Sequence, residues 1–153
     1  NTPALKNPDL IEQLAKRFGS QCIVVAIDSF AIKNNYNVHL YTGDPDQSKE
    51  SSKTTNSWIS EVQDRGAGEI VLNCMNQDGV REGYDLGQLR EMRNLCKVPL
   101  IASGGAGKMS DFYDVFNQAD VSGSLAASVF HKKIIDILDL KKYLQKKQIE
   151  VRL

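Results

Sequence analysis

The chain has 153 residues, 41% hydrophobic and 25% charged, and its 19 basic and 19 acidic side chains leave no formal net charge. This composition is typical of one globular domain, residues 1–153, and it excludes the strong overall field that attracts nucleic acid or an anionic membrane. No apolar run approaches the roughly 20 residues of a membrane span, and the first residues lack a signal-peptide pattern, so we expect a cytoplasmic protein.

The cysteines and histidines show no metal-binding pattern. Cys22, Cys74 and Cys96 form no C-x-x-C pair and lie in or beside apolar segments, so we expect reduced thiols in the core. His39 and His131 have no ligand partner at metal-binding spacing, and we interpret both as surface or packing residues. We therefore expect neither a metal nor a cofactor.

The first predicted elements are a helix and a strand. Asn7-Pro8-Asp9 is typical of a helix start with Asn7 as the N-cap, and apolar residues at helical spacing continue to Gly19. The apolar run 22–27 is rich in β-branched residues, as in a parallel strand covered on both faces, and it ends at Asp28.

Residues 30–55 have a different texture. Tyr36, Val38 and Leu40 alternate with other residues, which predicts a small hairpin. We expect the Ser/Lys/Thr-rich stretch that follows, as far as Thr55, to be mobile. We interpret the whole segment as an elaborated loop.

Three further strand–helix units follow. Trp58 lies on the apolar stripe of a helix that stops at Gly66, a capping-box-like start places a helix after Asp85, and Ser110 is the expected N-cap of the next helix. The strands are predicted at 69–74, 98–102 and 121–126, and a last helix at 139–146. This α/β alternation predicts a parallel sheet with right-handed crossovers, either a (β/α)4 half of a (β/α)8 TIM barrel or a flavodoxin-like open sheet.

Two strand ends have the chemistry of a phosphate site. The third strand runs into Gly104-Gly105, and the fourth is followed by small residues and Ser128, so backbone N–H groups at both ends are free to approach an anion. Asp28 and Asp78 follow the other strands and would lie on the same rim. Taken singly, the glycines could merely turn the chain and Asp28 could be an ordinary loop carboxylate.

Five motifs together resemble the cyclase subunit of imidazole glycerol phosphate synthase. They occur in that family's order over essentially the whole chain, at residues 24–28 (VVAID), 65–70 (RGAGEI), 78–85 (DGVREGYD), 101–107 (IASGGAG) and 125–131 (LAASVFH). The resemblance extends only to the C-terminal half of that (β/α)8 barrel.

The resemblance implies a lyase step of histidine biosynthesis. Ammonia, supplied by a glutaminase subunit, reacts with a bis-phosphorylated phosphoribulosyl-formimino precursor to give imidazole glycerol phosphate and aminoimidazole carboxamide ribonucleotide. Asp28 matches one of two acid/base carboxylates, and the other lies in the N-terminal half, so the half-barrel alone is expected to be inactive.

The resemblance also implies the binding residues. Asn73 and Ser103 would point into the barrel near the site, Asn1 and Thr2 would form a piece of one phosphate site, and the backbone N–H of Asp78 rather than its carboxylate would face the other phosphate. Glu69 matches a charged residue where ammonia enters, and Asn76 replaces a second acid found in many relatives. The second phosphate site would consist of Asp78, Gly79, Gly104, Gly105, Ala127 and Ser128.

Two other functions remain open from the sequence: a phosphate-binding half-barrel without catalysis, and a related phosphoribosyl isomerase of the same pathway. Four parallel strands would leave two edges and an apolar interior face uncovered. We therefore expect the chain to pair with an N-terminal half-barrel or with a second copy, and not to be a stable monomer.

Overall fold

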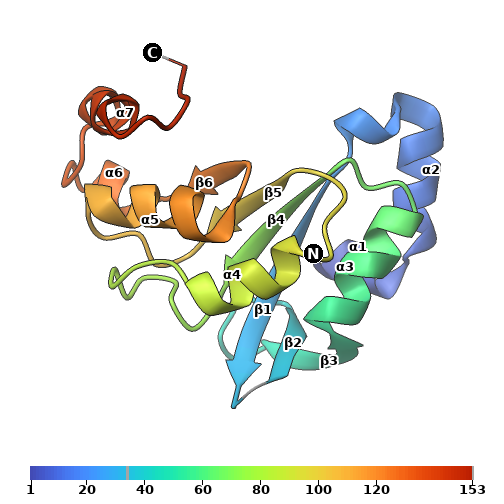
Figure 1. The fold of residues 1–153 in the computed structure, drawn as a ribbon. Helices are drawn as coiled ribbons and strands as arrows, with labels where there is room; N and C mark the ends of the chain where they lie inside the picture. Colours follow the sequence, from blue (N-terminus) through green and yellow to red (C-terminus); the bar gives the residue numbers. More distant parts are fainter. Residues whose placement is uncertain (34, 153) are drawn as a thin grey trace.

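The computed structural model describes residues 1–33 and 35–152, which form one curved sheet with helices around it (Figure 1). The strand order is β3-β2-β1-β4-β5-β6. The strands are β1 (Val24–Ile32), β2 (Asn35–Leu40), β3 (Lys49–Thr54), β4 (Glu69–Cys74), β5 (Leu100–Ser103) and β6 (Gly123–Leu125). β1, β4, β5 and β6 are parallel, whereas β2 and β3 add antiparallel strands beside β1.

The order of the parallel strands decides between the two expected architectures. They lie side by side in chain order, as in a (β/α)8 barrel, and not in the reversed order of a flavodoxin-like sheet. The sheet is open, with β3 and β6 at its edges. The expected barrel-type α/β architecture is therefore present as an unclosed segment.

Helices connect the parallel strands. α3, α4 and α5 follow one another along the sheet, with α4 between the other two (Figure 1). The helices are α1 (Thr2–Lys6), α2 (Asp9–Phe18), α3 (Thr55–Asp64), α4 (Leu86–Arg93), α5 (Met109–Ala119), α6 (Ser128–His131) and α7 (Ile137–Lys146). Within the described residues, none of these helices is both long and apolar enough to cross a membrane.

The two faces of the parallel sheet differ in burial. In β4 the residues Ile70 and Leu72 are fully buried, while Val71 between them faces the opposite side and is only half-buried. Trp58 of α3 is also fully buried, which confirms its predicted place in the core. On the open face Val24 keeps 52% of its surface exposed. The apolar core therefore lies between sheet and helices, and the other face is uncovered.

The start of α2 differs from the prediction. Pro8, not Asn7, is at the N-cap of α2, and Asn7 is the C-cap residue of the preceding helix α1. The reason is that residues 2–6 already form a helical turn, so Asn7 terminates that turn. Gly19 ends α2 as predicted, with φ of 86°.

The start of α5 also differs, whereas that of α4 agrees. Lys108 is the N-cap of α5, and Asp111 accepts hydrogen bonds from its N–H and from that of Gly107 at 2.9 and 2.8 Å. Ser110 is therefore inside the helix, and the carboxylate of Asp111 caps it by accepting from the N–H groups of the two residues before it. In α4 the predicted cap is confirmed, because Asp85 Oδ1 accepts a hydrogen bond from Gln88 N at 2.9 Å.

The largest difference concerns residues 30–54. β1 continues to Ile32 and pairs with β2, as the predicted hairpin requires, but the Ser/Lys/Thr-rich stretch forms β3 on the outer side of β2. Part of the segment expected to be mobile is thus a paired strand. Backbone hydrogen bonds to β2 order this strand. Backbone pairing does not require apolar side chains, so the sequence pattern did not reveal it.

Two of the three cysteines are buried as predicted. Burial raises the pKa of the Cys96 thiol to about 11, and it raises that of Cys74 further. Cys22 is exposed, contrary to expectation, because it ends a 3-10 turn just before β1 begins.

The two histidines have the surface or packing positions expected for them. The ring of His39 packs on Phe30 at a centroid distance of 5.3 Å, and His131 is exposed.

Candidate functional site

Asp28 is the centre of a hydrogen-bond network on the open face of the sheet. Its Oδ2 accepts from Asn1 Nδ2 at 2.7 Å and from Thr42 Oγ1 at 2.6 Å, and its Oδ1 accepts from Asn73 Nδ2 at 3.1 Å. An ionised carboxylate accepts hydrogen bonds at both oxygens, so this set of three donors suits the charged form. The network fixes the direction of the carboxylate.

Sheet register brings Asp28, Asn73 and Ser103 into one row. Asp28 is the register partner of Asn73, and Asn73 is that of Ser103, so the three side chains point to the same face of three adjacent strands. Ser103 Oγ donates to Asn73 Oδ1 at 3.2 Å. A continuous line of hydrogen bonds therefore runs from Ser103 to Asp28.

Behind Asp28, a buried polar cluster joins β1 to two helices. Ser29 and Thr55 share a hydrogen bond of 2.7 Å between their hydroxyl groups, and Gln88 donates its Nε2 to the Ser29 hydroxyl. All three side chains are fully buried. Because a buried polar group is costly without a partner, this cluster favours one position of β1 relative to α3 and α4.

A pocket of about 230 Å³ lies at the end of the same row. This volume is several times the roughly 30 Å³ that one water molecule occupies in the liquid. The pocket contains all six residues predicted for one phosphate site and, in addition, Arg81. It is lined by Asn73, Asp78, Gly79, Arg81, Ser103, Gly104, Gly105, Ala106, Leu125, Ala126, Ala127 and Ser128.

Several backbone N–H groups in this pocket are available to a ligand. Within residues 1–33 and 35–152, the N–H groups of Gly79, Gly104, Gly105, Ala127 and Ser128 donate no hydrogen bond inside the chain. Gly104 and Gly105 are nevertheless buried. Buried N–H groups are nearly always paired, so their grouping around one pocket favours an anion with several acceptor oxygens.

Asp78 contributes differently from the prediction. Its backbone N–H donates to Cys74 O at 3.1 Å within the turn that follows β4, so it is not free to bind a phosphate. The free N–H of the next residue, Gly79, is available instead. The charge of Arg81, which lines the same pocket, opposes the repulsion that the Asp78 carboxylate exerts on an anion.

The glycines of the β5 loop allow two loops to pack backbone against backbone. A Cβ on Gly105 would lie 2.1 Å from Gly83 O, and one on Gly104 would lie 2.8 Å from Cys74 O. Both glycines have positive φ, 114° and 91°, which L side chains rarely adopt. The glycines therefore turn the chain, and the turn that they form is also a wall of the pocket.

Tyr84 joins the loop after β4 to Leu125 of β6, which lines the pocket. Its hydroxyl donates to Leu125 O at 3.0 Å, and its ring packs edge-on against Phe112 at 5.8 Å. Burial raises the pKa of Tyr84 above its ordinary value, so it remains a neutral donor. This contact sets the position of the β6 end, from which Ala127 and Ser128 follow.

Asn1 and Thr2, predicted for the other phosphate, lie on the opposite side of Asp28. Asn1 Nδ2 binds His39 O at 2.6 Å in addition to Asp28, and Thr2 Oγ1 accepts from Tyr41 N at 2.9 Å. Both residues are therefore tied to the β2 side of the sheet, whereas the pocket lies on the β4 to β6 side. Phosphate binding by this pair stays a prediction.

Glu69 is separated from these groups along the strand. It begins β4 and pairs with Val24 at the amino ends of the parallel strands, whereas Asn73 lies near the carboxyl end of β4. Its side chain is half-buried on the open face. Its predicted role in ammonia entry is not tested by this geometry.

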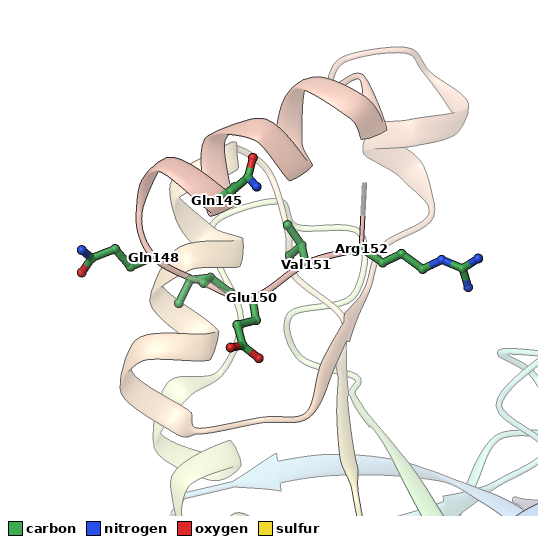
Figure 2. Close-up of a pocket in the computed structure, with 6 residues that line it drawn as sticks. Gln145, Gln148, Glu150, Val151 and Arg152 are labelled. Atoms are coloured by element: carbon green, nitrogen blue, oxygen red, sulfur yellow. The ribbon is translucent and has the colours of Figure 1, made fainter.

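A larger hollow of about 600 Å³ lies along the C-terminal segment 145–152. Its polar side chains do not converge, since Gln148, Glu150 and Arg152 point in different directions (Figure 2). Among the residues that the structure describes, no three His, Cys, Asp or Glu side chains gather as a metal site. The row from Asp28 to the anion pocket is therefore the candidate site.

Comparison with known proteins identifies the family of this chain. A model of the family described as "Histidine biosynthesis protein" matches residues 1–136. The chain belongs to this histidine biosynthesis family. The family has the (β/α)8 barrel fold, which confirms the predicted fold class and agrees with the strand order found here.

Individual members of the histidine biosynthesis family are similar over almost the whole chain. Imidazole glycerol phosphate synthase subunit HisF of Tolumonas auensis is 61% identical over 99% of this chain, and the proteins of the same name from Pseudoalteromonas translucida and Pasteurella multocida are 56% and 59% identical. The chain spans 60% of the length of each of these relatives. This partial coverage agrees with the open sheet, which is a segment of the family's barrel.

Two polar side chains of the site were not predicted. Thr42 was assigned to the elaborated loop, and no sequence pattern marks its hydroxyl as a partner of Asp28. Arg81 had a detectable signal, because it is a basic residue three positions beyond Asp78 in a loop predicted to bind phosphate. A search for cations near the expected anion would have found it.

Proposed function

We propose that this chain is part of a cyclase of histidine biosynthesis. In this reaction ammonia and the bis-phosphorylated phosphoribulosyl-formimino precursor yield imidazole glycerol phosphate and aminoimidazole carboxamide ribonucleotide. The observation that carries the proposal is the row on the open face, in which the oriented carboxylate of Asp28 and an anion pocket are joined through Asn73 and Ser103. The similarity to subunits of imidazole glycerol phosphate synthase supports the same reaction.

Asp28 is the proposed acid/base group. Its carboxylate lies on the open face at the carboxyl end of a barrel strand, where a bound substrate approaches it. Hydrogen bonds from Asn1, Thr42 and Asn73 hold it in one direction. A carboxylate held in this way can accept a proton from the reacting substrate and return it.

The anion pocket is proposed to hold one substrate phosphate. The free N–H groups of Gly79, Gly104, Gly105 and Ser128 would bind its oxygens, and Arg81 would supply a positive charge. A phosphate bound in this pocket would align the substrate along the row towards Asp28. Asn73 and Ser103 would then lie beside the central part of the substrate. Asn1 and Thr2 would contribute to the second phosphate site on the other side.

The rest of the proposed activity depends on the part of the barrel that this chain does not cover. We infer that this part contains the second carboxylate of the acid/base pair and covers the open apolar face, so the chain alone is inactive. A glutaminase partner would deliver ammonia at the amino ends of the strands, beside Glu69. The word subunit in the relatives' names supports such an assembly.

The test uses a completed chain, in which this chain is joined to the part of the Tolumonas auensis subunit that it does not cover. We expect this completed chain to form imidazole glycerol phosphate in proportion to added ammonium salt. A glutaminase subunit with glutamine should replace the ammonium salt.

Two results would contradict the proposal. Turnover of a phosphoribosyl isomerase substrate without any nitrogen donor would favour the isomerase of the same pathway. Phosphate binding without turnover of either substrate would favour the half-barrel that only binds.

A further inference from the structure

The side chain of Asn76 is bound to the backbone of one residue at the end of β1. Ala31 N donates to Asn76 Oδ1 at 2.7 Å, and Asn76 Nδ2 donates to Ala31 O at 3.2 Å. Both polar ends of the carboxamide are therefore used by Ala31. Asn76 is also not among the residues that line the anion pocket.

These two bonds continue the pairing of β1 with β4 beyond the last backbone bond. Met75 N donates to Ser29 O at 2.9 Å, and then the chain after β4 turns away. The carboxamide of Asn76 takes the place of the next backbone amide, because it offers one donor and one acceptor to Ala31. A carboxylate at this position could accept from Ala31 N but would repel Ala31 O.

Asn76 binds the part of β1 that also pairs with β2 in the hairpin. Ala31 pairs with Tyr36 of β2, and β2 leads directly to Thr42. Thr42 donates to Asp28 Oδ2, and the carbonyl of His39 holds Asn1, which donates to the same oxygen. The hairpin thus supplies or supports both hydrogen bonds to Oδ2, whereas Oδ1 is held from β4.

We propose that Asn76 is a positioning residue for Asp28, acting through the hairpin and the hydroxyl of Thr42. This inference rests on the proposed role of Asp28 in the cyclase. Asn76 anchors the hairpin to the parallel sheet, and the anchored hairpin keeps Thr42 within hydrogen-bond distance of the carboxylate. The acid/base group is therefore oriented from two sides, by the sheet through Asn73 and by the hairpin through Thr42.

The first experiment compares Asn76→Asp with Gln77→Glu in the completed chain. Asn76→Asp keeps the acceptor for Ala31 N, removes the donor and adds a charge, while Gln77→Glu adds the same charge one residue away. We expect kcat of Asn76→Asp to fall about ten-fold or more, the usual range for a group that orients a reacting residue, with KM unchanged. Gln77→Glu should retain the kcat of the parent.

The second experiment tests whether Asn76 acts through Thr42. Thr42→Val removes the hydroxyl at constant size and should lower kcat to a similar degree, and Thr42→Ser should restore most of it. Adding Asn76→Asp to Thr42→Val should lower kcat by less than two-fold further, because the hydrogen bond that Asn76 supports is already gone. If Asn76→Asp does not fold, Asn76→Ala takes its place, since it removes both bonds without adding a charge.

The outcomes separate this inference from the proposed function. An unchanged kcat in Asn76→Asp, a parallel rise in KM, or full additivity with Thr42→Val would overturn the positioning role while leaving the role of Asp28 intact. Retention of turnover by Asp28→Asn would instead overturn the proposed function. The two failures therefore appear in different variants.

Discussion

Asn73 Nδ2 donates to Asp28 Oδ1 at 3.1 Å, and the two residues are register partners on adjacent parallel strands. The direction of the carboxylate is therefore set by the sheet itself and not only by loops. Ser103 extends the same row on the next strand, and the anion pocket begins there. Sheet register thus aligns the proposed acid/base group with the proposed phosphate site.

The first prediction concerns Asp28→Asn in the completed chain. Asparagine keeps the size of the side chain but cannot take or give a proton at neutral pH. We expect ammonia-dependent turnover to fall by about two orders of magnitude or more, the usual range for the loss of a general acid or base, with little change in KM. Steady-state kinetics measure both quantities.

Asp64→Asn is the matched control, because it removes an exposed carboxylate at the end of α3. It should keep the turnover of the parent. If Asp28→Asn lost substrate affinity and turnover in parallel, Asp28 would be a binding residue and its acid/base role would be wrong.

The second prediction concerns the anion pocket of this chain. Because the N–H groups of Gly104, Gly105 and Ser128 donate no hydrogen bond within the described residues, their amide resonances should shift when inorganic phosphate is added. The amide of Gly43, which lies in the turn after β2, should not shift. Binding should be weak, and Arg81→Gln should weaken it further by removing a positive charge from the pocket.

Amide chemical shifts measured during a phosphate titration provide the test. An absence of shifts at phosphate concentrations well above physiological would contradict the pocket assignment. Equal shifts in the parent and in Arg81→Gln would contradict only the role of Arg81.

The third prediction concerns self-association of this chain by itself. Val24 is 52% exposed and lies in β1 on the open face of a sheet that is not closed. Uncovered apolar strands favour pairing, so we expect the chain not to be a stable monomer. Val24→Asp should weaken the association, whereas Val80→Asp, which changes a valine of 47% exposure in the β4 loop, should not.

Sedimentation velocity at micromolar concentration distinguishes the states. A compact monomer that unfolds cooperatively would show that the open face needs no cover. Equal association of both valine variants would place the contact elsewhere on the molecule.

The fourth prediction concerns the contact between the two loops of the pocket. In Gly105→Ala the added Cβ would lie 2.1 Å from Gly83 O at a residue with φ of 114°. We expect the free energy of unfolding of the completed chain to fall by about 2–4 kcal/mol, the range for strained backbone combined with overpacking. Urea denaturation measures the change.

Gly43→Ala is the control, because a Cβ at Gly43 meets no atom within 4 Å. Its unfolding free energy should stay within about 0.5 kcal/mol of the parent, as for most surface substitutions. A loss in Gly105→Ala no larger than this would mean that the loops separate without cost.

Much of the site could be predicted from the sequence because it consists of strand ends. Apolar runs mark β1, β4 and β5, and residues that follow such runs in a parallel sheet gather at one edge, so Asp28 and Gly104 could be placed together. The partners of Asp28 could not be deduced in the same way. Thr42 comes from a segment without an apolar stripe, and its position depends on backbone pairing.

The remaining differences from the prediction lie where short turns join neighbouring elements. Asn7 has the chemistry of an N-cap, but it ends a helical turn that a propensity argument does not predict. Asp78 has an N–H group at the expected place, yet a turn bond to Cys74 uses it. Cys22 lies beside an apolar run, but a 3-10 turn leaves it exposed. Each outcome depends on how the neighbouring backbone folds in three dimensions.

The sequence by itself determined the α/β alternation, the order of its strand–helix units and the rim on which Asp28, the glycine loop and Ser128 lie, because hydrophobic periodicity is a local property of the chain. The choice between a barrel-type and a flavodoxin-like strand order came from the pairing of the strands. Only the tertiary structure decided which donors orient the carboxylate, which N–H groups remain free for an anion and which face of the sheet stays open. Hydrogen bonds such as those of Asn76 and Thr42 join residues distant in sequence, and their geometry exists only once the strands have paired.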